Sequence, residues 1–535
     1  MIMRTENIAS MEQPEQIQTQ PVAGCRTAVE DKQVAAAAGS SLAAALKKCF
    51  SFPVLLGALL VVANFVIERP LRNEPDTWWH LKDGEFLLRT HHFPAGDIYS
   101  FTAHGVFRMV YEWAGSIPMA IAYRLGGLRG LDVLLITLTS IIVALIYYYA
   151  YLRCRNSKAA FLAAAAALPF ASLCFTLRPQ LIGFIFLILT LICLERYRQG
   201  RQKSLWALPP IFLLWVNTHG SFALGLFILG VYWVSGLFSF SSGGLVAERW
   251  QLKQRIHIAL IFLLSLAVLP ITPYGTRMAV YPLNMAFSQP LNVANIMEWQ
   301  PIPFSFWQTK YLVLLLLAII IAMIALRPKY RLEEIGLFLF ATFSTLLHAR
   351  FVILFAMLVA PIIGELISRW IPPYKPDIDK HAINAVLILA GVIMMCTHLP
   401  SQSDLLENVA KEEPVHAVEY MREHSVPGPM FNDYGFGGYL LWALGPKHKV
   451  FIDGRADLYE ETGVFLDYAM IEDIKPATLR ILRNYGIKSC MVAPDNGLAT
   501  LLSALPEWKR VYADNVATIF VRTGTSAPVA AGSSK

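Results

Sequence analysis

The sequence predicts a polytopic α-helical membrane protein with about 11 transmembrane helices, followed by a small C-terminal α/β domain. Of 535 residues, 56% are hydrophobic and only 16% are charged, whereas about a quarter of a typical soluble chain is charged. The apolar residues form runs long enough to cross or nearly cross a bilayer. The formal charge of +7 includes no dense Lys/Arg tract, so no nucleic-acid partner is expected. The seven cysteines form no CxxC pair that would indicate a zinc site.

The N-terminal segment and the membrane part differ in composition. Residues 1–48 are rich in Gln, Ala and Thr and lack apolar periodicity, so we expect a disordered cytoplasmic tail. Residues 49–398 are expected to form the transmembrane domain. The apolar runs that predict its helices are 49–67, 131–152, 159–176, 180–195, 205–218, 220–238, 256–273, 311–326, 333–348, 351–369 and 382–398.

Loop charges predict the topology through the positive-inside rule. Basic residues gather in the N-terminal tail and in five loops: 153–158, 196–203, 249–255, 327–331 and 369–380. All of these lie inside only if segment 113–126 is a helix on the outer surface and does not cross the membrane. A large first outer loop, 68–130, and everything after residue 399 then lie outside.

From residue 399 the composition becomes that of a soluble domain. Residues 399–522 are expected to form an extracytoplasmic α/β domain in which helices alternate with strands. The expected strands are 428–431, 448–452, 487–493 and a hairpin at 509–521, with helices near 414–424, 476–484 and 497–505. Residues 523–535 are rich in Ala, Ser and Gly and are expected to be disordered.

Two acids stand where the first predicted span leaves the membrane. Glu74 and Asp76 precede the pair Trp78-Trp79, and His80 follows. Such carboxylates suit a general base or a site for a divalent cation, Mg²⁺ or Mn²⁺. The alternative is an aromatic belt at the membrane surface with ordinary solvated acids.

Other polar residues occupy predicted outer turns. Two of them are arginines, Arg178 and Arg350. A guanidinium can donate two hydrogen bonds to one phosphate, so these arginines are candidates for phosphate binding. The alternatives are arginines that reach lipid headgroups and polar residues that cap short helices. The candidate residues in these turns are Arg178, Gln180, Asn217, His219, Glu298, His348 and Arg350.

Two polar patches follow predicted strands of the C-terminal domain, where α/β folds usually place their sites. One contains Asp433 and Tyr434, and the other contains Asp453 and Arg455. No dinucleotide fingerprint, P-loop, Gly-x-Ser-x-Gly or His-Glu-x-x-His motif occurs, so nucleotide use, serine hydrolysis and zinc proteolysis are disfavoured.

These residues and their order resemble the C-type (GT-C) glycosyltransferases, integral membrane enzymes that take sugars from polyprenyl-phosphate carriers. Glu74-Pro75-Asp76 looks like the acidic pair of their first outer loop, and Asp76–His80 is similar to the Asp-Pro-aromatic-aromatic-His stretch of oligosaccharyltransferases. Asn432–Gly435 resembles the end of the Trp-Trp-Asp-Tyr-Gly motif, and Ile296–Glu298 resembles the end of Thr-Ile-x-Glu. Protein O-mannosyltransferases share the architecture. Asp453–Asp457 looks like uncharacterised bacterial relatives of this superfamily.

The resemblance implies a glycosyltransferase of the bacterial cytoplasmic (inner) membrane, with a polyprenyl-phosphate sugar donor and a lipid, glycan or protein acceptor at the extracytoplasmic face. Asp76 would be the catalytic base with help from Glu74, and these two would be the ligands of any divalent cation. Arg178 and Arg350 would hold the carrier phosphate. The sugar or acceptor site would be lined by His80, Gln180, Asn217, His219, Glu298 and His348, and covered by Asp433, Tyr434, Asp453 and Arg455.

Two other classes of function stay open. A lipid-linked glycan flippase or small-solute transporter usually carries ionisable residues near the bilayer midplane, between inverted repeats. Here the polar residues gather at one face and no repeat is visible, which argues against transport. A membrane receptor or assembly factor is the third class.

Overall fold

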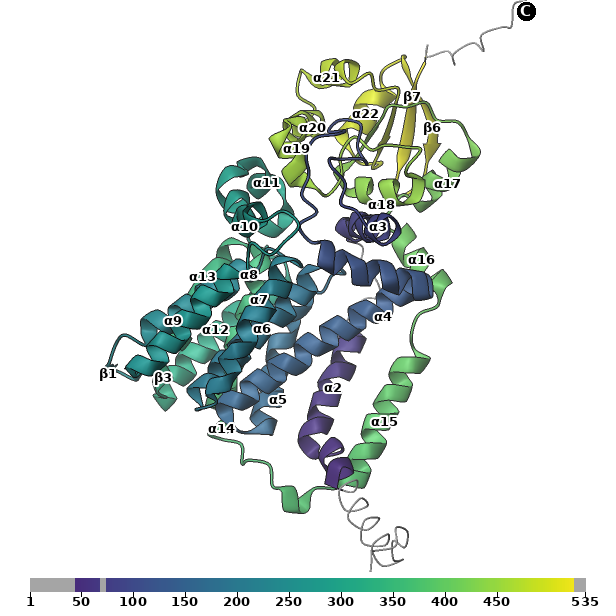
Figure 1. Cartoon of the computed structure of the whole chain (residues 1–535). Helices are drawn as coiled ribbons and strands as arrows, with labels where there is room; N and C mark the ends of the chain where they lie inside the picture. The colour runs from purple at the N-terminus through teal and green to yellow at the C-terminus, as the bar shows by residue number, and fades with distance from the viewer. Residues whose placement is uncertain (1–43, 68–73, 524–535) are drawn as a thin grey trace, which may run out of the picture.

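The computed structural model describes residues 44–67 and 74–523 (Figure 1). The tails predicted at 1–48 and 523–535 lie almost entirely outside these ranges, as do residues 68–73 of the first outer loop. Residues 44–49, where the predicted tail ends, are helical.

Each of the 11 predicted membrane runs contains a helix. These helices are α2 (Phe52–Ile67), α4 (Trp113–Cys154), α5 (Ser157–Ala171), α6 (Gln180–Arg198), α7 (Leu208–Val216), α8 (Phe222–Ser235), α9 (Leu252–Ala267), α12 (Trp307–Leu326), α13 (Leu332–Leu347), α14 (Val352–Ser368) and α15 (His381–Thr397). By length and composition, five described helices can cross a bilayer, namely α4, α5 with its 3₁₀ extension, α6, α12 and α14 with the 3₁₀ turn before it. A sixth is added if α15 and the bent helix after it count as one. The chain is therefore a multi-pass membrane protein, while the count of 11 spans stays a prediction.

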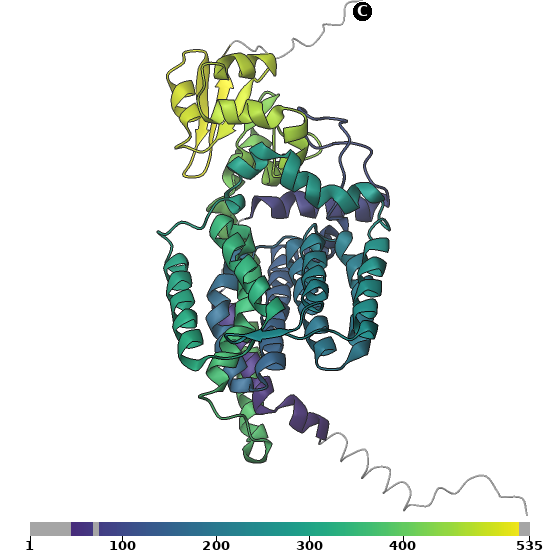
Figure 2. The same ribbon diagram turned by 90° about the vertical axis from the view of Figure 1, so that its left-hand side faces the viewer.

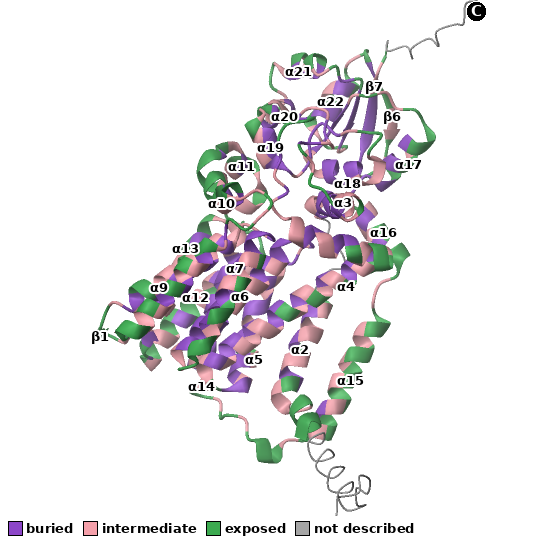
Figure 3. Ribbon diagram, viewed as in Figure 1, coloured by how far each residue is buried: buried purple, intermediate pink, exposed green. Residues whose placement is uncertain are grey.

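Helix α14 lies at the centre of the bundle. Every residue from Val352 to Gly364 is buried. Its neighbour α5 approaches closely because five buried alanines, at 159, 160, 163, 164 and 167, give it a smooth face. Figure 3 shows the contrast between this buried centre and the exposed outer helices such as α12. The exposed residues of α12 are mostly Leu and Ile, as expected of a helix that faces lipid.

Helix α4 consists of two segments that meet at Gly127. This glycine has φ +59°, a left-handed conformation that favours glycine, and the helix breaks there. The side chain of Gln402 lies in the break, donating to the Gly126 carbonyl at 3.0 Å and accepting from the Arg129 amide at 3.1 Å. The segment before the break corresponds to the predicted surface helix 113–126, and the segment after it contains the predicted span 131–152.

Several helices lie across one end of the bundle. Figures 1 and 2 show α3 (Pro75–Thr90) and α10 (Thr276–Ser288) nearly perpendicular to the membrane helices. The short helices α11 (Pro290–Asn295), η3 (Met297–Trp299) and η4 (Ala349–Phe351) lie at the same end. We call this end the outer end, following the predicted topology.

The C-terminal body contains one four-stranded sheet in the order β4-β5-β7-β6. Strands β4 (Met430–Asn432) and β5 (Ser489–Val492) are parallel, while β7 (Thr518–Arg522) runs antiparallel to both β5 and β6 (Trp508–Ala513). The helices are α16 (Gln402–Ala410), α17 (Val415–Glu423), α18 (Tyr434–Leu444), α19 (Ala456–Glu461), α20 (Val464–Glu472), α21 (Thr478–Asn484) and α22 (Gly497–Ser503).

Two details of this body differ from prediction. Segment 448–452 is not a strand of the sheet, because its backbone forms only an isolated bridge between Val450 and Ser100 of the first outer loop. The glycine-rich segment after Asp433 forms helix α18, which packs on α3. Both segments serve contacts with the membrane part.

The opposite end of the bundle carries a small sheet and ion pairs. Strands β1 (Phe240–Ser242), β2 (Leu245–Ala247) and β3 (Tyr330–Arg331) form the sheet. Arg153 pairs with Glu334 at 2.5 Å, and Arg331 pairs with Glu195 at 2.6 Å. The 3₁₀ helices η1 (Ser172–Cys174), η2 (Gln202–Ala207) and η5 (Pro376–Ile378) complete the described elements.

Candidate functional site

Arg178 is the meeting point of three acidic side chains at the outer end. Its Nη2 lies 2.7 Å from Asp76 Oδ2, and its Nη1 lies 3.6 Å from Glu74 Oε1 and also contacts Glu298. The acids come from the start of α3 and from η3, and the arginine comes from the turn before α6. The sequence predicts each residue as part of the site, and the structure brings all four together.

Local structure explains why Asp76 faces this turn. Pro75 occupies the first position of α3, where a missing N–H costs nothing, and Asp76 lies in the first helical turn, where the helix dipole favours an anion. Thr77 donates its hydroxyl hydrogen to the Leu177 carbonyl at 2.9 Å, which ties α3 to the turn that carries Arg178. The start of α3 is therefore fixed against α6.

Asp76 has a second partner within α3. Its Oδ1 accepts a hydrogen bond from Trp79 Nε1 at 2.9 Å, while Oδ2 faces Arg178. Both oxygens thus have fixed donors, and about 15% of the side chain is exposed to solvent. Part of the carboxylate remains accessible to a ligand.

Burial and charge act differently on the three acids. Burial raises the pKa of Glu74 to about 7, although Arg178 opposes the rise. Burial also raises the pKa of Asp76, against the effect of Arg178. For Glu298 burial has the same upward effect, but Arg178 and Arg350 together outweigh it and hold the pKa below its usual range. At neutral pH Glu74 is therefore the carboxyl of this group most readily protonated.

A fourth acid, Glu112, lies between His80 and His219, the two histidines predicted for the site. Its Oε2 is 3.0 Å from His80 Nε2, and its Oε1 is 3.5 Å from His219 Nε2. Burial lowers the pKa of His80 to about 3 and that of His219 to about 4, so both rings are neutral at pH 7. The Ser221 amide donates to His219 Nδ1 at 3.1 Å, which leaves the proton of that neutral ring on Nε2, facing Glu112.

Sequence reasoning did not select Glu112 as a site residue. The available signal was an acid beside a tryptophan, Glu112-Trp113, directly before a predicted surface helix. Asp76 and Trp78 show the same association, so this pattern could have identified it.

The remaining outer-turn residues divide into ring contacts and structural hydrogen bonds. The Arg350 guanidinium lies 4.1 Å from the centre of the Trp299 ring, and His348 Nδ1 lies 2.5 Å from the Trp299 carbonyl oxygen. Asn217 accepts from Trp113 Nε1 at 3.0 Å and donates to the Leu213 and Ile271 carbonyls. Gln180 donates to Thr176 Oγ1 at 3.3 Å. Asn217 and Gln180 thus hold the turns, while Arg350 faces the site.

The C-terminal body closes directly on Asp76. Tyr434 donates its hydroxyl hydrogen to the Gly454 carbonyl at 3.2 Å. Gly454 packs so tightly that a Cβ atom there would lie 1.7 Å from Asp76 Oδ1. Gly438 of α18 is packed in a similar way, because a Cβ atom there would lie 2.1 Å from the Pro75 carbonyl oxygen. Gly454 is a site residue that the sequence analysis did not single out, because nothing in the sequence shows which backbone it contacts.

Asp453 and Arg455, on either side of Gly454, are buried in one ionic cluster. Arg455 contacts both Asp453 and Asp97, and its Nε lies 2.6 Å from Asp453 Oδ1. The Tyr459 hydroxyl donates to Asp453 Oδ2 at 2.8 Å. Asp97 belongs to the first outer loop, so this cluster links that loop to the C-terminal body and determines where Gly454 lies.

Asp433 lies at the end of β4, as predicted, with its carboxyl group directed into the C-terminal body. Its Oδ2 accepts from the Ala493 amide at 2.6 Å, and its Oδ1 accepts from Asn496 at 3.1 Å. Burial raises its pKa to about 7. Its contacts with Ala493 and Asn496 join the ends of β4 and β5.

The donor set around Glu74 and Asp76 does not fit a divalent cation. Within residues 44–67 and 74–523, no three His, Cys, Asp or Glu side chains form a group that could hold a metal ion. The position between Glu74 and Asp76 is taken by the guanidinium of Arg178. Arg178 therefore already supplies positive charge to these carboxylates.

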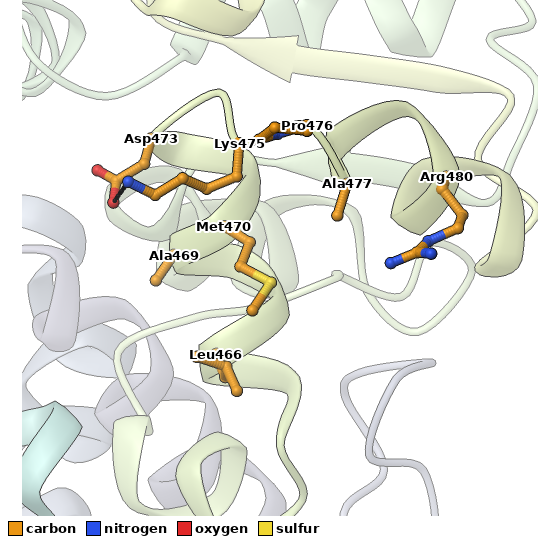
Figure 4. Close-up of a pocket in the computed structure, with 8 residues that line it drawn as sticks. All are labelled: Leu466, Ala469, Met470, Asp473, Lys475, Pro476, Ala477 and Arg480. Atoms are coloured by element: carbon orange, nitrogen blue, oxygen red, sulfur yellow. Dashed lines mark ion pairs between the residues drawn. The ribbon is translucent and has the colours of Figure 1, made fainter.

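A separate pocket of about 590 Å³ opens on the C-terminal body between α20 and α21 (Figure 4). Its lining combines apolar side chains such as Met470 with Lys475 and Arg480. None of the residues around Arg178 lines it, so we do not assign it to the same site.

No protein-family model and no curated protein sequence matches the chain. Among solved structures, the archaeal oligosaccharyltransferase AglB from Archaeoglobus fulgidus, in complex with an inhibitory peptide and a dolichol-phosphate, is similar with a TM-score of 0.50. The identity is 11%, over 89% of this chain and 74% of that chain. ArnT from Cupriavidus metallidurans in the apo state gives a TM-score of 0.49 at 14% identity, over 87% and 97% of the two chains. ArnT bound to undecaprenyl phosphate gives 0.47 at 13% identity, over 88% and 98%. At these identities the similarity shows the fold alone.

Proposed function

Because the chain has the GT-C fold that its sequence predicts, we propose that it is an integral membrane glycosyltransferase. It would transfer a sugar from a polyprenyl-phosphate donor to a lipid, glycan or protein acceptor at the extracytoplasmic face. The observation that supports this function best is the placement of Asp76. Its carboxylate is held by Arg178 and Trp79 at the same end of the bundle as a second guanidinium, that of Arg350.

Asp76 is our choice for the catalytic base. It would accept the proton of the acceptor hydroxyl or amine as the nucleophile attacks the anomeric carbon of the donor. Burial raises its pKa, which brings a carboxylate closer to the range in which general bases work best. Its two fixed donors hold the carboxylate in one orientation, and such positioning reduces the entropic cost of reaching the transition state.

Arg350 is our choice for the principal contact of the carrier phosphate. Among the described residues, no carboxylate lies within 4 Å of its guanidinium, whereas Arg178 has three acidic partners. The flat face of Trp299 supports Arg350 and leaves its N–H groups available for a phosphate. As the bond to the sugar breaks, charge grows on the phosphate and the guanidinium stabilises it. Arg178, which contacts Glu298, would add to this stabilisation as a second guanidinium.

The other predicted site residues would act around this pair. His80 and His219 are neutral and lie against Glu112, so they would line the site by orienting this carboxyl group beside the sugar or acceptor. Tyr434 and Gly454 form a wall beside Asp76 and would limit the acceptor that can approach. The solved AglB complex contains an inhibitory peptide and a dolichol-phosphate, so a protein with this fold binds a lipid phosphate.

Turnover by purified protein tests this function. A panel of undecaprenyl-phosphate-linked sugars would be incubated with the protein and with total lipid, glycan or peptide acceptors from a bacterial envelope. Asp76→Asn is expected to abolish transfer while leaving the melting temperature close to that of the native chain. Glu85→Gln is the matched control, because Glu85 lies on the same helix but pairs only with Lys82, at 3.8 Å. Transfer at the native rate by Asp76→Asn would exclude Asp76 as the base.

The orientation is tested by labelling single cysteines in a variant that lacks the seven natural ones. Each introduced cysteine must be accessible to the reagent, so buried positions such as Thr77 and Ser157, each 2% exposed, are unsuitable for labelling. His92 and Ser425 are exposed at the outer end, while Gln202 and Ser242 are exposed at the opposite end. An impermeant maleimide is expected to label the first pair in intact cells and the second pair only after lysis. The reverse pattern would place the proposed site in the cytoplasm.

A further inference from the structure

The three carboxylates around Arg178 supply oxygen atoms of the kind that divalent cations prefer, yet the cation that they contact is a guanidinium. Hard divalent cations prefer carboxylate oxygens, and two or three such groups are typical of their sites. Here Glu74, Asp76 and Glu298 converge from two separate segments of the outer end. Convergence of acids is costly without a cation to balance it.

We propose that Arg178 takes the place of a divalent metal ion, so that the site works with a guanidinium as the cation bound to these carboxylates. The proposal deepens the proposed function. Its turnover experiment rests on that function, whereas its metal-binding experiment does not. Its consequence is an enzyme that does not need a divalent cation.

The geometry of the oxygens supports an arginine. Asp76 contacts Nη2, whereas Glu74 and Glu298 contact Nη1. The acidic oxygens are thus distributed over two nitrogen atoms of a flat group. A magnesium ion needs its oxygens at about 2.0–2.1 Å around one point, which would require these side chains to leave the guanidinium.

The backbone turn that carries Arg178 is fixed, so a movement of the turn cannot withdraw the guanidinium to admit a metal ion. Its backbone amide donates to the Thr176 carbonyl at 2.8 Å, and its carbonyl accepts from the Leu181 amide at 3.1 Å. The following residue, Pro179, packs directly on Gly115, where a Cβ atom would lie 2.4 Å from the proline ring. The turn is therefore fixed between α4 and α6.

Electrostatics also opposes two cations at once. A divalent ion placed between the carboxylates would lie next to Arg178, and Arg350 is a further cation near enough to lower the pKa of Glu298. If the acids turned to the metal instead, a guanidinium that is only 18% exposed would lose its partners. Leaving a largely buried charge unpaired is strongly unfavourable.

Direct binding of Mn²⁺ tests the proposal without a substrate. Electron paramagnetic resonance on the purified full-length chain is expected to show no stoichiometric Mn²⁺ site, and removal of metals with EDTA is expected to leave turnover unchanged. Arg178→Ala removes the resident cation but keeps the three acids, so it is expected to gain one Mn²⁺ site. Adding Asp76→Asn to that variant should remove the new site. Arg350→Ala is the matched control, since the three acids keep Arg178, and it should gain none.

Two results would overturn the proposal. One is a stoichiometric Mn²⁺ site in the native chain that Asp76→Asn abolishes. The other is turnover that EDTA abolishes and Mn²⁺ restores. If Arg178→Ala does not fold, the comparison of the native chain with Asp76→Asn still decides the question. A chain that binds no Mn²⁺ and transfers no sugar would contradict the proposed function and leave the absence of a metal site standing.

Discussion

Replacing Gly454 with alanine is expected to displace Asp76 from its two partners. The new Cβ atom would lie 1.7 Å from Asp76 Oδ1 and 2.9 Å from Trp79 Nε1. To reach even 3.0 Å, below which real Cβ contacts essentially never occur, the methyl group and the carboxylate must separate by about 1.3 Å. Asp76 is 2.7 Å from Arg178 and 2.9 Å from Trp79, so a shift of this size breaks at least one of these contacts.

The magnitude follows from the nature of the lost contacts. Hydrogen bonds to charged groups contribute about 1.5–3 kcal/mol each, and misplacing a reacting group by about 1 Å can cost on the order of 100-fold in rate. We therefore expect Gly454→Ala to lower turnover about 100-fold and to lower the melting temperature modestly. The backbone cannot relax freely, because Tyr434 holds the Gly454 carbonyl and Arg455 is bound by Asp453 on the other side.

Gly435→Ala is the matched control for this variant. Gly435 lies in the first turn of α18, next to Tyr434, but no atom outside its own turn of helix lies within 4 Å of its Cβ position. Alanine in a helix is more favourable than glycine by about 0.5–1 kcal/mol, so this variant should be as stable as the native chain or more so. The assays are transfer from an undecaprenyl-phosphate sugar and thermal unfolding in detergent. Native turnover and stability of Gly454→Ala would refute the inference that this contact positions Asp76.

Three further predictions concern single groups. Burial raises the pKa of Asp433 to about 7, so the folded chain holds a proton that the unfolded chain releases near pH 4. Stability therefore falls by about 1.4 kcal/mol per pH unit between pH 4 and 7 and levels off above 7. Asp433→Asn should remove this fall in melting curves recorded from pH 5 to 8. Burial raises the pKa of Glu413 well above its usual value, so the neutral variant Glu413→Gln should melt like the native chain. Glu413→Ala should lower the free energy of unfolding by about 1–3 kcal/mol in chemical denaturation, because Trp78 Nε1 loses its acceptor at 2.8 Å. Arg350→Ala should weaken binding of undecaprenyl phosphate at least about 10-fold, or 1.4 kcal/mol, as measured by titration. Undecaprenol, which lacks the phosphate, is the control ligand and should bind neither the native chain nor the variant. Equal affinity of the native chain and the variant for undecaprenyl phosphate would contradict the phosphate role of Arg350.

Much of the site was predictable because its residues break strong local rules. Glu74, Asp76, Arg178 and Arg350 are ionisable groups close to the ends of apolar runs, where charge is costly and therefore informative. Glu298 is an acid within the loop between the runs 256–273 and 311–326. The loop charges predicted that all five share one face. The sequence could not show that four of them form one cluster around Arg178, because their pairing depends on how helices far apart in the chain pack together.

The contacts made by small residues were not predictable. Gly437 and Gly438 lie inside α18, where their missing side chains let the helix approach the backbone of other segments. The predicted strand at 448–452 failed for a related reason. Val450, Phe451 and Ile452 favour a strand, but the partner of Val450 is Ser100 of the first outer loop instead of a strand of the sheet. Local propensity does not specify such partners.

These contacts also show that the C-terminal body and the membrane part form one site. Gly454 bounds Asp76, Glu413 accepts the hydrogen bond of Trp78, and Arg455 is shared between Asp453 and Asp97. Breaking the contact with Glu413 leaves buried Trp78 Nε1 of α3 without its acceptor, which costs about 1–3 kcal/mol. A truncated chain that ends before residue 399 would therefore be expected to lose the orientation of Asp76 as well as its cover. The geometry of the proposed base depends on a domain that contributes no charged group to the cluster around Arg178.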